Sequence, residues 1–225
     1  ESQEWGTRFH QIMQQRELGL SVAPLLDADP ELAAAVDRIV EAAPELFHSQ
    51  DAQLRQSEHR RTTAFGEFVL TVVYDLLLLT PEKAQIIDWK TYPKPKDKKN
   101  LQQDWQTRLY LYVLAETADY KPEQLSMSYW FVRAQDPATG ELQPTQVEIN
   151  YSTQKHRQTD RDLQKLTAQL TQLMAEDEPF PKVSLAAGRC DSCPYAMRCQ
   201  RPSELYPTDL ATHLPAIEDI AEVPL

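Results

Sequence analysis

The sequence predicts an α/β domain built around a mixed β-sheet. The first observation is a pair of apolar runs, at residues 65–79 and 84–91, which flank the turn-like segment TPEK at 80–83. Runs rich in Val, Ile and Leu around such a break predict a β-hairpin. The second observation is a helical pattern at 101–118 followed by a strand pattern at 125–135. Hairpin and helical crossover connections in one chain indicate a sheet with both antiparallel and parallel pairs.

Local signals place the elements in chain order. Apolar residues at helical spacing predict a helix over 5–18. Asp29 and Pro30 suit the N-cap and the first position of a second helix that ends near Ala43. The remaining predictions are a strand at 57–64, the hairpin, an exposed loop at 92–100, a helix at 101–118 capped by Asn100, strands at 125–135 and 142–151, and a long helix at 153–176 with the apolar stripe Leu163, Leu166, Leu170 and Leu173.

Charged residues interrupt the apolar hairpin. Residues 69–79 show almost no polar alternation, which predicts a central strand covered on both faces, yet Asp75 lies in it. With the loop centred between residues 81 and 82, the expected pairs are Leu79 with Ala84, Leu77 with Ile86 and Asp75 with Asp88. Lys90 follows on the same face as Asp88. Two opposed carboxylates repel unless a proton or cation lies between them, so a hard divalent cation fits this place. A buried ion triad without metal is the alternative.

Composition narrows the functional classes. The formal net charge of −11 argues against a broad nucleic-acid surface, but residues 1–60 and the tail from Arg201 hold nearly all the excess acid. Five glycines leave no glycine-rich phosphate loop, and no apolar run is long enough to cross a membrane. Three cysteines indicate a reducing, cytoplasmic location. The chain begins at Glu1 without a Met, so we expect a fragment of a longer protein.

Five motifs, in this order, resemble those of one known family. They are Gly6-Thr7-Arg8-Phe9-His10, Asp75, Asp88-Trp89-Lys90, Gln106-Thr107-Arg108-Leu109-Tyr110 and Cys190-x-x-Cys193-x5-Cys199. The Asp motifs resemble the PD-(D/E)XK nuclease superfamily, and the other three resemble its RecB-type exonuclease branch. The resemblance implies a restriction-endonuclease-like core in the order α-β-β-β-α-β, with an added β-hairpin, a long helix and a C-terminal Cys segment.

The resemblance also implies a metal site and its ligands. Asp75 and Asp88 match the metal-binding carboxylates, and His10 matches the histidine that joins them on the metal. The backbone carbonyl of Trp89 would be a further ligand, and Lys90 matches the catalytic lysine. The cofactor would be Mg²⁺ or Mn²⁺, and a His ligand suits Mn²⁺ better. Position alone would also allow His10 to be a packed residue of an amphipathic helix.

Other matched residues point to the substrate. Gln106 and Tyr110 match residues that contact DNA or order the site, although they could equally be a polar helix face. A basic cluster follows the strand of Lys90, and such a loop is either solvated or close to phosphate. Its members are Lys94, Lys96, Lys98 and Lys99.

The three cysteines indicate a second metal site. Cys190, Cys193 and Cys199 match the C-terminal iron–sulfur ligands of the branch, which implies a [4Fe–4S] cluster whose fourth Cys is absent from this sequence. Zinc held by the three thiolates and His213 is an alternative, as are inert buried thiols.

The predicted organisation is a nuclease domain at 1–180, with its core at about 5–135, and a Cys-bearing segment with an acidic tail at 181–225, packed on the same domain. The predicted function is metal-dependent hydrolysis of DNA phosphodiester bonds, most simply as an exonuclease in DNA repair, recombination or related processing, with no membrane partner. A degenerate DNA-binding or assembly module is one alternative, favoured by Val73 where the branch commonly has Gly. A zinc-stapled interaction protein is the other.

Overall fold

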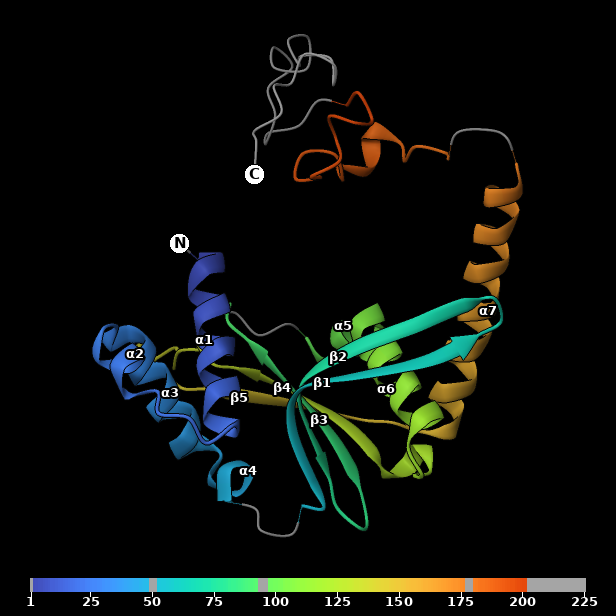
Figure 1. Ribbon diagram of the computed structural model, residues 1–225. Helices are drawn as coiled ribbons and strands as arrows, with labels where there is room; N and C mark the ends of the chain where they lie inside the picture. The colour runs from blue at the N-terminus through green and yellow to red at the C-terminus, as the bar shows by residue number, and fades with distance from the viewer. Residues whose placement is uncertain (1, 49–51, 93–96, 177–179, 202–225) are drawn as a thin grey trace, which may run out of the picture. The chain divides into compact units, whose positions relative to one another are not determined.

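A five-stranded mixed sheet organises the fold (Figure 1). The computed structural model describes residues 2–48, 52–92, 97–176 and 180–201. The strands lie in chain order, β1 to β5, and only the β3–β4 pair is parallel. They are β1 (Leu54–Phe65), β2 (Phe68–Leu79), β3 (Ala84–Lys90), β4 (Leu125–Phe131) and β5 (Thr145–Asn150). The predicted mixed sheet and α-β-β-β-α-β core order are confirmed.

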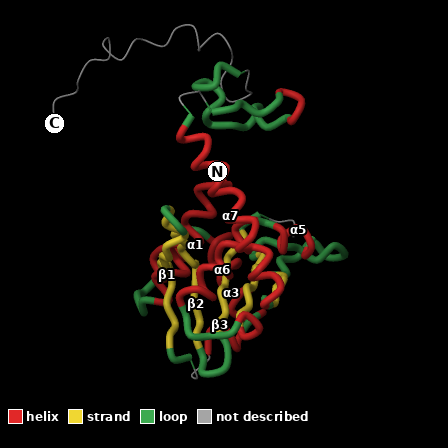
Figure 2. The backbone as a smooth tube through the Cα atoms, turned by 90° about the vertical axis from the view of Figure 1, so that its right-hand side faces the viewer, coloured by secondary structure: helices red, strands yellow, loops and turns green. Residues whose placement is uncertain are grey.

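Helices cover both faces of the sheet and enclose two apolar clusters (Figures 1 and 2). One cluster packs α1 and α3 against Leu76, Leu78 and Ile87. The other packs α6 and the first half of α7 against Leu77, Ile86 and the strands beside them. The helices are α1 (Ser2–Glu17), α2 (Ala23–Asp27), α3 (Pro30–Ala42), α4 (Pro44–His48), α5 (Lys98–Gln103), α6 (Trp105–Thr117) and α7 (Thr153–Ala175).

The hairpin register agrees with the prediction. Leu79 pairs with Ala84 and Leu77 with Ile86, because the turn closes through Thr80 N–H donating to the Lys83 carbonyl at 2.9 Å. The ladder between β2 and β3 ends at Leu76–Ile87, one step before Asp75 and Asp88. The two carboxylates therefore lie where the strands separate.

Strand β2 changes face at Asp75. Tyr74 packs in the cluster beside α6, whereas Leu76 packs in the cluster beside α1. Alternate residues of a regular strand share a face, so the strand must twist sharply between these two positions. Opposite this point Glu58 has a left-handed φ of 48°, and it is left out of the otherwise regular β1–β2 ladder.

The prediction that β2 is covered on both faces holds for only one half of the strand. The residues from Leu76 to Leu78 are buried, in keeping with a central strand. Beyond the twist, Val69 is 67% exposed and Val73 is 38% exposed. The outer half of the β1–β2 hairpin is covered on one face only, because α6 packs against that face and nothing among the described residues covers the other.

The helix predicted over 101–118 is two helices. Asp104, with φ −61° and ψ 137°, interrupts it, and its side chain caps α6 by accepting from the Gln106 N–H. Asp97, not Asn100, caps α5. The short helices α2 and α4 were not predicted, and β4 and β5 are shorter than expected. Asp29 caps α3 as predicted, accepting from the Leu32 N–H at 3.1 Å.

The chain divides into two compact units, Glu1–Ala168 and Gln169–Leu225, with the boundary inside α7. The predicted packing of the Cys segment on the nuclease domain stays a prediction. No helix among the described residues is long and apolar enough to cross a membrane.

Candidate active site

The two carboxylates of the predicted hairpin, Asp75 and Asp88, lie where strands β2 and β3 separate. Asp75 Oδ2 accepts a hydrogen bond from the backbone N–H of Trp89 at 2.7 Å, which replaces a ladder bond between β2 and β3. The Trp89 side chain turns to the opposite face and is buried between Phe9 and Phe47. This packing fixes the short segment that carries Asp88 and Lys90.

Helix α1 brings His10 to Asp75. His10 Nδ1 lies 3.4 Å from Asp75 Oδ1. The helix is held by buried Phe9, Ile12 and Met13 on its inner face. It also lies very close to the residue after Lys90, because a Cβ on Gly6 would be only 2.8 Å from Thr91 Oγ1. The glycine of the Gly-x-x-x-His motif therefore permits the approach that places His10, one helical turn later, at the site.

Glu58 joins these two residues and was not among the predicted ligands. Donor atoms of His10, Glu58 and Asp75 all lie within 4.8 Å of one another, the one such group of three or more found in the described residues. Glu58 stands opposite Asp75 because Phe65 pairs with Phe68 around a Gly66-Glu67 turn. That two-residue turn was the signal in the sequence that could have found it.

Asp88, Lys90 and Gln106 form a second group beside the first. Lys90 Nζ lies 2.7 Å from Asp88 Oδ2 and donates to Gln106 Oε1 at 2.9 Å. Gln106 Nε2 in turn donates to Asp88 Oδ1 at 2.6 Å. Asp88 is only 2% exposed. The Lys90 ammonium is the charged partner of the buried Oδ2 oxygen of Asp88.

The electrostatics show a local excess of negative charge. Burial, with the nearby Asp75 carboxylate, raises the pKa of Asp88 to about 6, although Lys90 opposes the rise. Burial and the Asp75 charge likewise raise the pKa of Glu58. Burial lowers the pKa of His10, but its contacts with Asp75 and the charge of Asp88 outweigh this, and the net shift is upward. A bound cation would lower all three pKa values, because it favours the ionised carboxylates and the neutral imidazole.

The second polar residue on α6 also reaches the site. Tyr110 lies one turn after Gln106, and burial together with the charge of Asp88 raises its pKa, while its contact with Gln106 lowers it. Its ring packs edge-on against Tyr74, whose hydroxyl donates to the Tyr110 carbonyl at 3.0 Å. The structure thus brings His10, Asp75, Asp88, Lys90, Gln106 and Tyr110 to one place and adds Glu58. Their catalytic and substrate-binding roles stay predictions.

The donor set suits a divalent metal. Two carboxylates and an imidazole converge, and the charges of Asp75 and His10 both act on Asp88 in the adjoining strand. Oxygen-rich sets hold Mg²⁺ or Mn²⁺, and one His among them favours Mn²⁺. The ligand roles of His10, Asp75, Asp88 and the Trp89 carbonyl all stay predictions.

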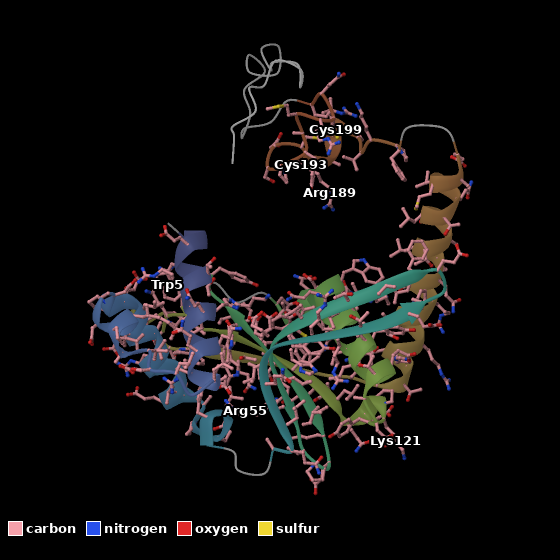
Figure 3. All side chains as sticks on the ribbon, viewed as in Figure 1. Trp5, Arg55, Lys121, Arg189, Cys193 and Cys199 are labelled. Atoms are coloured by element: carbon pink, nitrogen blue, oxygen red, sulfur yellow. The ribbon has the colours of Figure 1, made fainter. Side chains whose placement is uncertain are left out.

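The other predicted features are only partly described. Cys190, Cys193 and Cys199 are free thiols in the second unit, and Figure 3 labels the last two. The Cys193 N–H donates to the Cys190 carbonyl at 3.2 Å, but the three sulfurs do not form a group within 4.8 Å in the described structure. Lys98 and Lys99 begin α5, whereas Lys94, Lys96 and His213 lie outside the described residues.

The family model of the PD-(D/E)XK nuclease superfamily matches residues 1–200. The chain belongs to this superfamily. The match spans both groups of the site, so the PD-(D/E)XK assignment rests on the whole domain and not on one motif. No curated relative matches the sequence.

A solved structure shares the fold of this chain at low sequence identity. A "Putative exonuclease" from Eubacterium rectale superposes with a TM-score of 0.52 at 13% identity, over 86% of this chain and 73% of that one. At this identity the likeness concerns the fold. A second structure, SSO0001, matches with a TM-score of 0.38 at 16% identity, over 86% of this chain and 83% of that one.

Proposed function

We propose that this PD-(D/E)XK protein is a metal-dependent DNA nuclease that hydrolyses phosphodiester bonds. The observation that carries the proposal is the meeting of Asp75, Asp88 and Lys90 where β2 and β3 separate, with His10 and Glu58 completing a donor cluster. A structural ion triad would need neither of the last two residues. It would also gain nothing from the sharp twist that presents Asp75.

The residues of the site would have different roles in the reaction. A bound Mg²⁺ or Mn²⁺ would polarise the scissile phosphate and lower the pKa of the attacking water. His10, Glu58 and Asp75 would hold the ion, and Asp88 is the further predicted carboxylate ligand. Lys90, held by Asp88 and Gln106, presents a fixed positive charge to the phosphate, where charge develops during the reaction. Gln106 positions both partners of that ion pair.

The test is cleavage of end-labelled DNA with Mn²⁺, Mg²⁺ or EDTA, comparing the starting protein with Lys90→Ala. We expect cleavage that needs the metal and falls at least about 100-fold in the variant, the range in which positioned charges act. Lys121→Ala is the matched control, because Lys121 is exposed and lies four residues before β4 begins at Leu125 (Figure 3). Lys90, in contrast, pairs with Phe131, the last residue of β4. Equal cleavage by Lys90→Ala would refute the assignment.

Exonuclease action in DNA repair or recombination is the finer form of the proposal. It is supported by the motif resemblance and by the name of the Eubacterium rectale neighbour. The product ladder of the same assay separates the cases, since an exonuclease releases short products from one end. DNA retention without cleavage would instead favour the degenerate binding module.

An iron–sulfur cluster on Cys190, Cys193 and Cys199 is a separate part of the proposal. Its support is the Cys-x-x-Cys spacing with a third thiol on the same short segment. The present arrangement does not fit the group, because the sulfurs are not gathered and a fourth ligand is missing from the described residues. Iron and acid-labile sulfide measured per purified chain would decide it, and zinc in their place would favour a structural zinc site.

A further inference from the structure

The Lys90 ammonium has a third neighbour besides Asp88 and Gln106. Its Nζ atom lies over the ring of Tyr129, 5.0 Å from the ring centre. Tyr129 belongs to β4 and pairs with Asp88 in the parallel β3–β4 ladder, so it projects from the same face of the sheet as Asp88 and Lys90. Tyr129 is only 1% exposed. A buried aromatic face therefore lies against the charged end of the lysine.

Two hydroxyl hydrogen bonds fix the orientation of this ring. Thr107 Oγ1 donates to the Leu101 carbonyl at 2.5 Å and lies 2.7 Å from the Tyr129 hydroxyl. Because a threonine hydroxyl has a single hydrogen, the Tyr129 hydroxyl must be the donor in the second contact. Thr107 and Tyr129 are both buried. The ring is therefore anchored through its hydroxyl to α5 and α6 before any substrate binds.

Two consecutive residues of α6 hold the lysine from different sides. Gln106 accepts a hydrogen bond directly from the Lys90 ammonium. Thr107 acts through the ring of Tyr129, whose hydroxyl it accepts from. Both residues lie in the first turn of α6, immediately after the helix break and cap at Asp104. The start of α6 is therefore the common support for both contacts of the ammonium.

The ring attracts the ammonium without using one of its hydrogens. An ammonium group has three N–H donors, and Asp88 Oδ2 at 2.7 Å and Gln106 Oε1 at 2.9 Å lie within reach of two of them. The negative face of an aromatic ring attracts a cation electrostatically, without the lone pair of an ordinary acceptor. A carboxylate in the place of the ring would instead compete with a phosphate oxygen for the lysine. The third N–H of Lys90 therefore stays available for the phosphate.

We propose that Tyr129 is a positioning residue of the nuclease, which holds the Lys90 ammonium by cation–π attraction and so directs it at the scissile phosphate. The inference rests on the proposed nuclease function. Cation–π attraction is strongest where both partners are shielded from water. The Lys90 side chain is 18% exposed and Tyr129 is buried, so the contact lies in the stronger part of its range. Tyr129 acts on the reaction only through Lys90.

Packing alone is the competing explanation for Tyr129. It is one of the largest fully buried side chains, and it belongs to the apolar cluster beside α6. Packing, however, depends on the shape of the ring, whereas cation–π attraction depends on the electron density at the ring face. Fluorine atoms on the ring withdraw this density and change the shape little. A series of fluorinated rings at position 129 therefore separates the two explanations.

The test is single-turnover cleavage of end-labelled DNA with Mn²⁺, by proteins that carry phenylalanine with no, one, two or three ring fluorines at position 129. Tyr129→Phe keeps the ring face and should keep most of the rate. The rate should then fall stepwise with each fluorine, to about 2- to 30-fold below that of Tyr129→Phe, the range of cation–π contacts. The protein concentration that gives half the maximal rate should stay unchanged, because the lysine acts on charge that develops in the transition state.

The same fluorinated series at Tyr151 is the matched control. Tyr151 is a buried tyrosine of the same apolar cluster. Its backbone N–H donates to the carbonyl of Leu125, the first residue of β4, whereas Lys90 pairs with Phe131, the last. Fluorination at position 151 should therefore leave the cleavage rate unchanged.

A measurement without cleavage separates this inference from the nuclease proposal. In metal-free protein with isotope-labelled lysines, the NMR signal of the Lys90 Hε protons, identified as the one that Lys90→Arg removes, should be shifted upfield by the Tyr129 ring. The shift should persist in Tyr129→Phe and disappear in Tyr129→Leu. A flat fluorine series in cleaving protein, or an upfield signal that survives Tyr129→Leu, would overturn the inference. Absence of cleavage by the starting protein would refute the nuclease proposal instead, and the lysine signal would then decide whether the ring holds Lys90.

Discussion

Replacing Gly6 with Ala tests how the first helix builds the metal site. The new Cβ would meet Thr91 Oγ1 at 2.8 Å, whereas ordinary contacts lie at 3.4–4 Å. The contact is relieved either by a shift of helix α1 of about 0.6 Å or by rotation of the Thr91 side chain, and Mn²⁺ affinity distinguishes the two. We expect the helix shift. His10 lies four residues along the same helix and would move with it.

The substitution should affect protein stability and metal binding differently. Ala stabilises a helix by about 1 kcal/mol relative to Gly, which offsets much of the clash. A metal site, however, tolerates displacements of only about 0.5 Å. We therefore expect a free energy of unfolding within about 1 kcal/mol of the starting protein, but about tenfold weaker Mn²⁺ binding, at the lower end of the effects seen when ligand orientation is disturbed.

The assay is Mn²⁺ titration by calorimetry beside chemical unfolding without metal. Adding Thr91→Ala to Gly6→Ala removes the oxygen, and the remaining Thr91 Cβ at 3.6 Å is an ordinary contact, so affinity should return. Thr91→Ser keeps the hydroxyl and should not rescue. Unaltered Mn²⁺ affinity in Gly6→Ala, or a loss that Thr91→Ala leaves in place, would show that this contact does not position His10.

Three further predictions concern the same site. Gln106→Leu removes both hydrogen bonds to the Asp88–Lys90 pair, so kcat should fall about 10- to 100-fold while KM and stability change little, and Gln154→Leu, at an exposed position of α7, is the control. Without metal, stability should fall as pH rises. The raised pKa of Asp88 lowers stability progressively between about pH 4 and about pH 6, and the full loss (at most about 3 kcal/mol) persists at higher pH. His10 then loses its stabilising contribution as the pH rises above 6.5. A flat profile in denaturant unfolding would contradict this, and Asp88→Asn should remove the first step. Mn²⁺ at 100 times its Kd should stabilise the protein by about 2.7 kcal/mol in thermal unfolding, and Asp75→Ala should abolish the gain.

The sequence predicted the parts of the site that depend on short-range geometry. The turn at Thr80–Lys83 fixes the register, and the two-residue period of a strand then puts Asp88 and Lys90 on one face. Gln106 and Tyr110 share a helix face for the same kind of reason. Each of these features follows from the local geometry of one hairpin or one helix, without contacts between distant parts of the chain.

Other features depend on interactions that periodicity does not contain. Glu58 reaches the site only because the ladder with β2 breaks opposite Asp75. The helix break at Asp104 was missed because apolar periodicity continues across it, although an Asp that accepts from the N–H two residues later is a capping signal. The very close approach of α1 to Thr91 is a tertiary contact for which Gly6 is only permissive.

The twist at Glu58 and Asp75 explains why two separate groups form one site. The left-handed φ at Glu58 is a strained conformation that persists only where surrounding contacts enforce it. Beyond the twist, the outer hairpin lies along α6: Arg61 donates to the Thr117 carbonyl at 2.7 Å, and the Phe65 and Tyr112 rings meet at 6.0 Å. The hairpin thereby fixes the helix that carries Gln106, and Gln106 fixes Asp88 and Lys90. One local distortion thus presents Asp75 and Glu58 to His10 and also secures the helix behind the lysine, which is why the strain is located at the site.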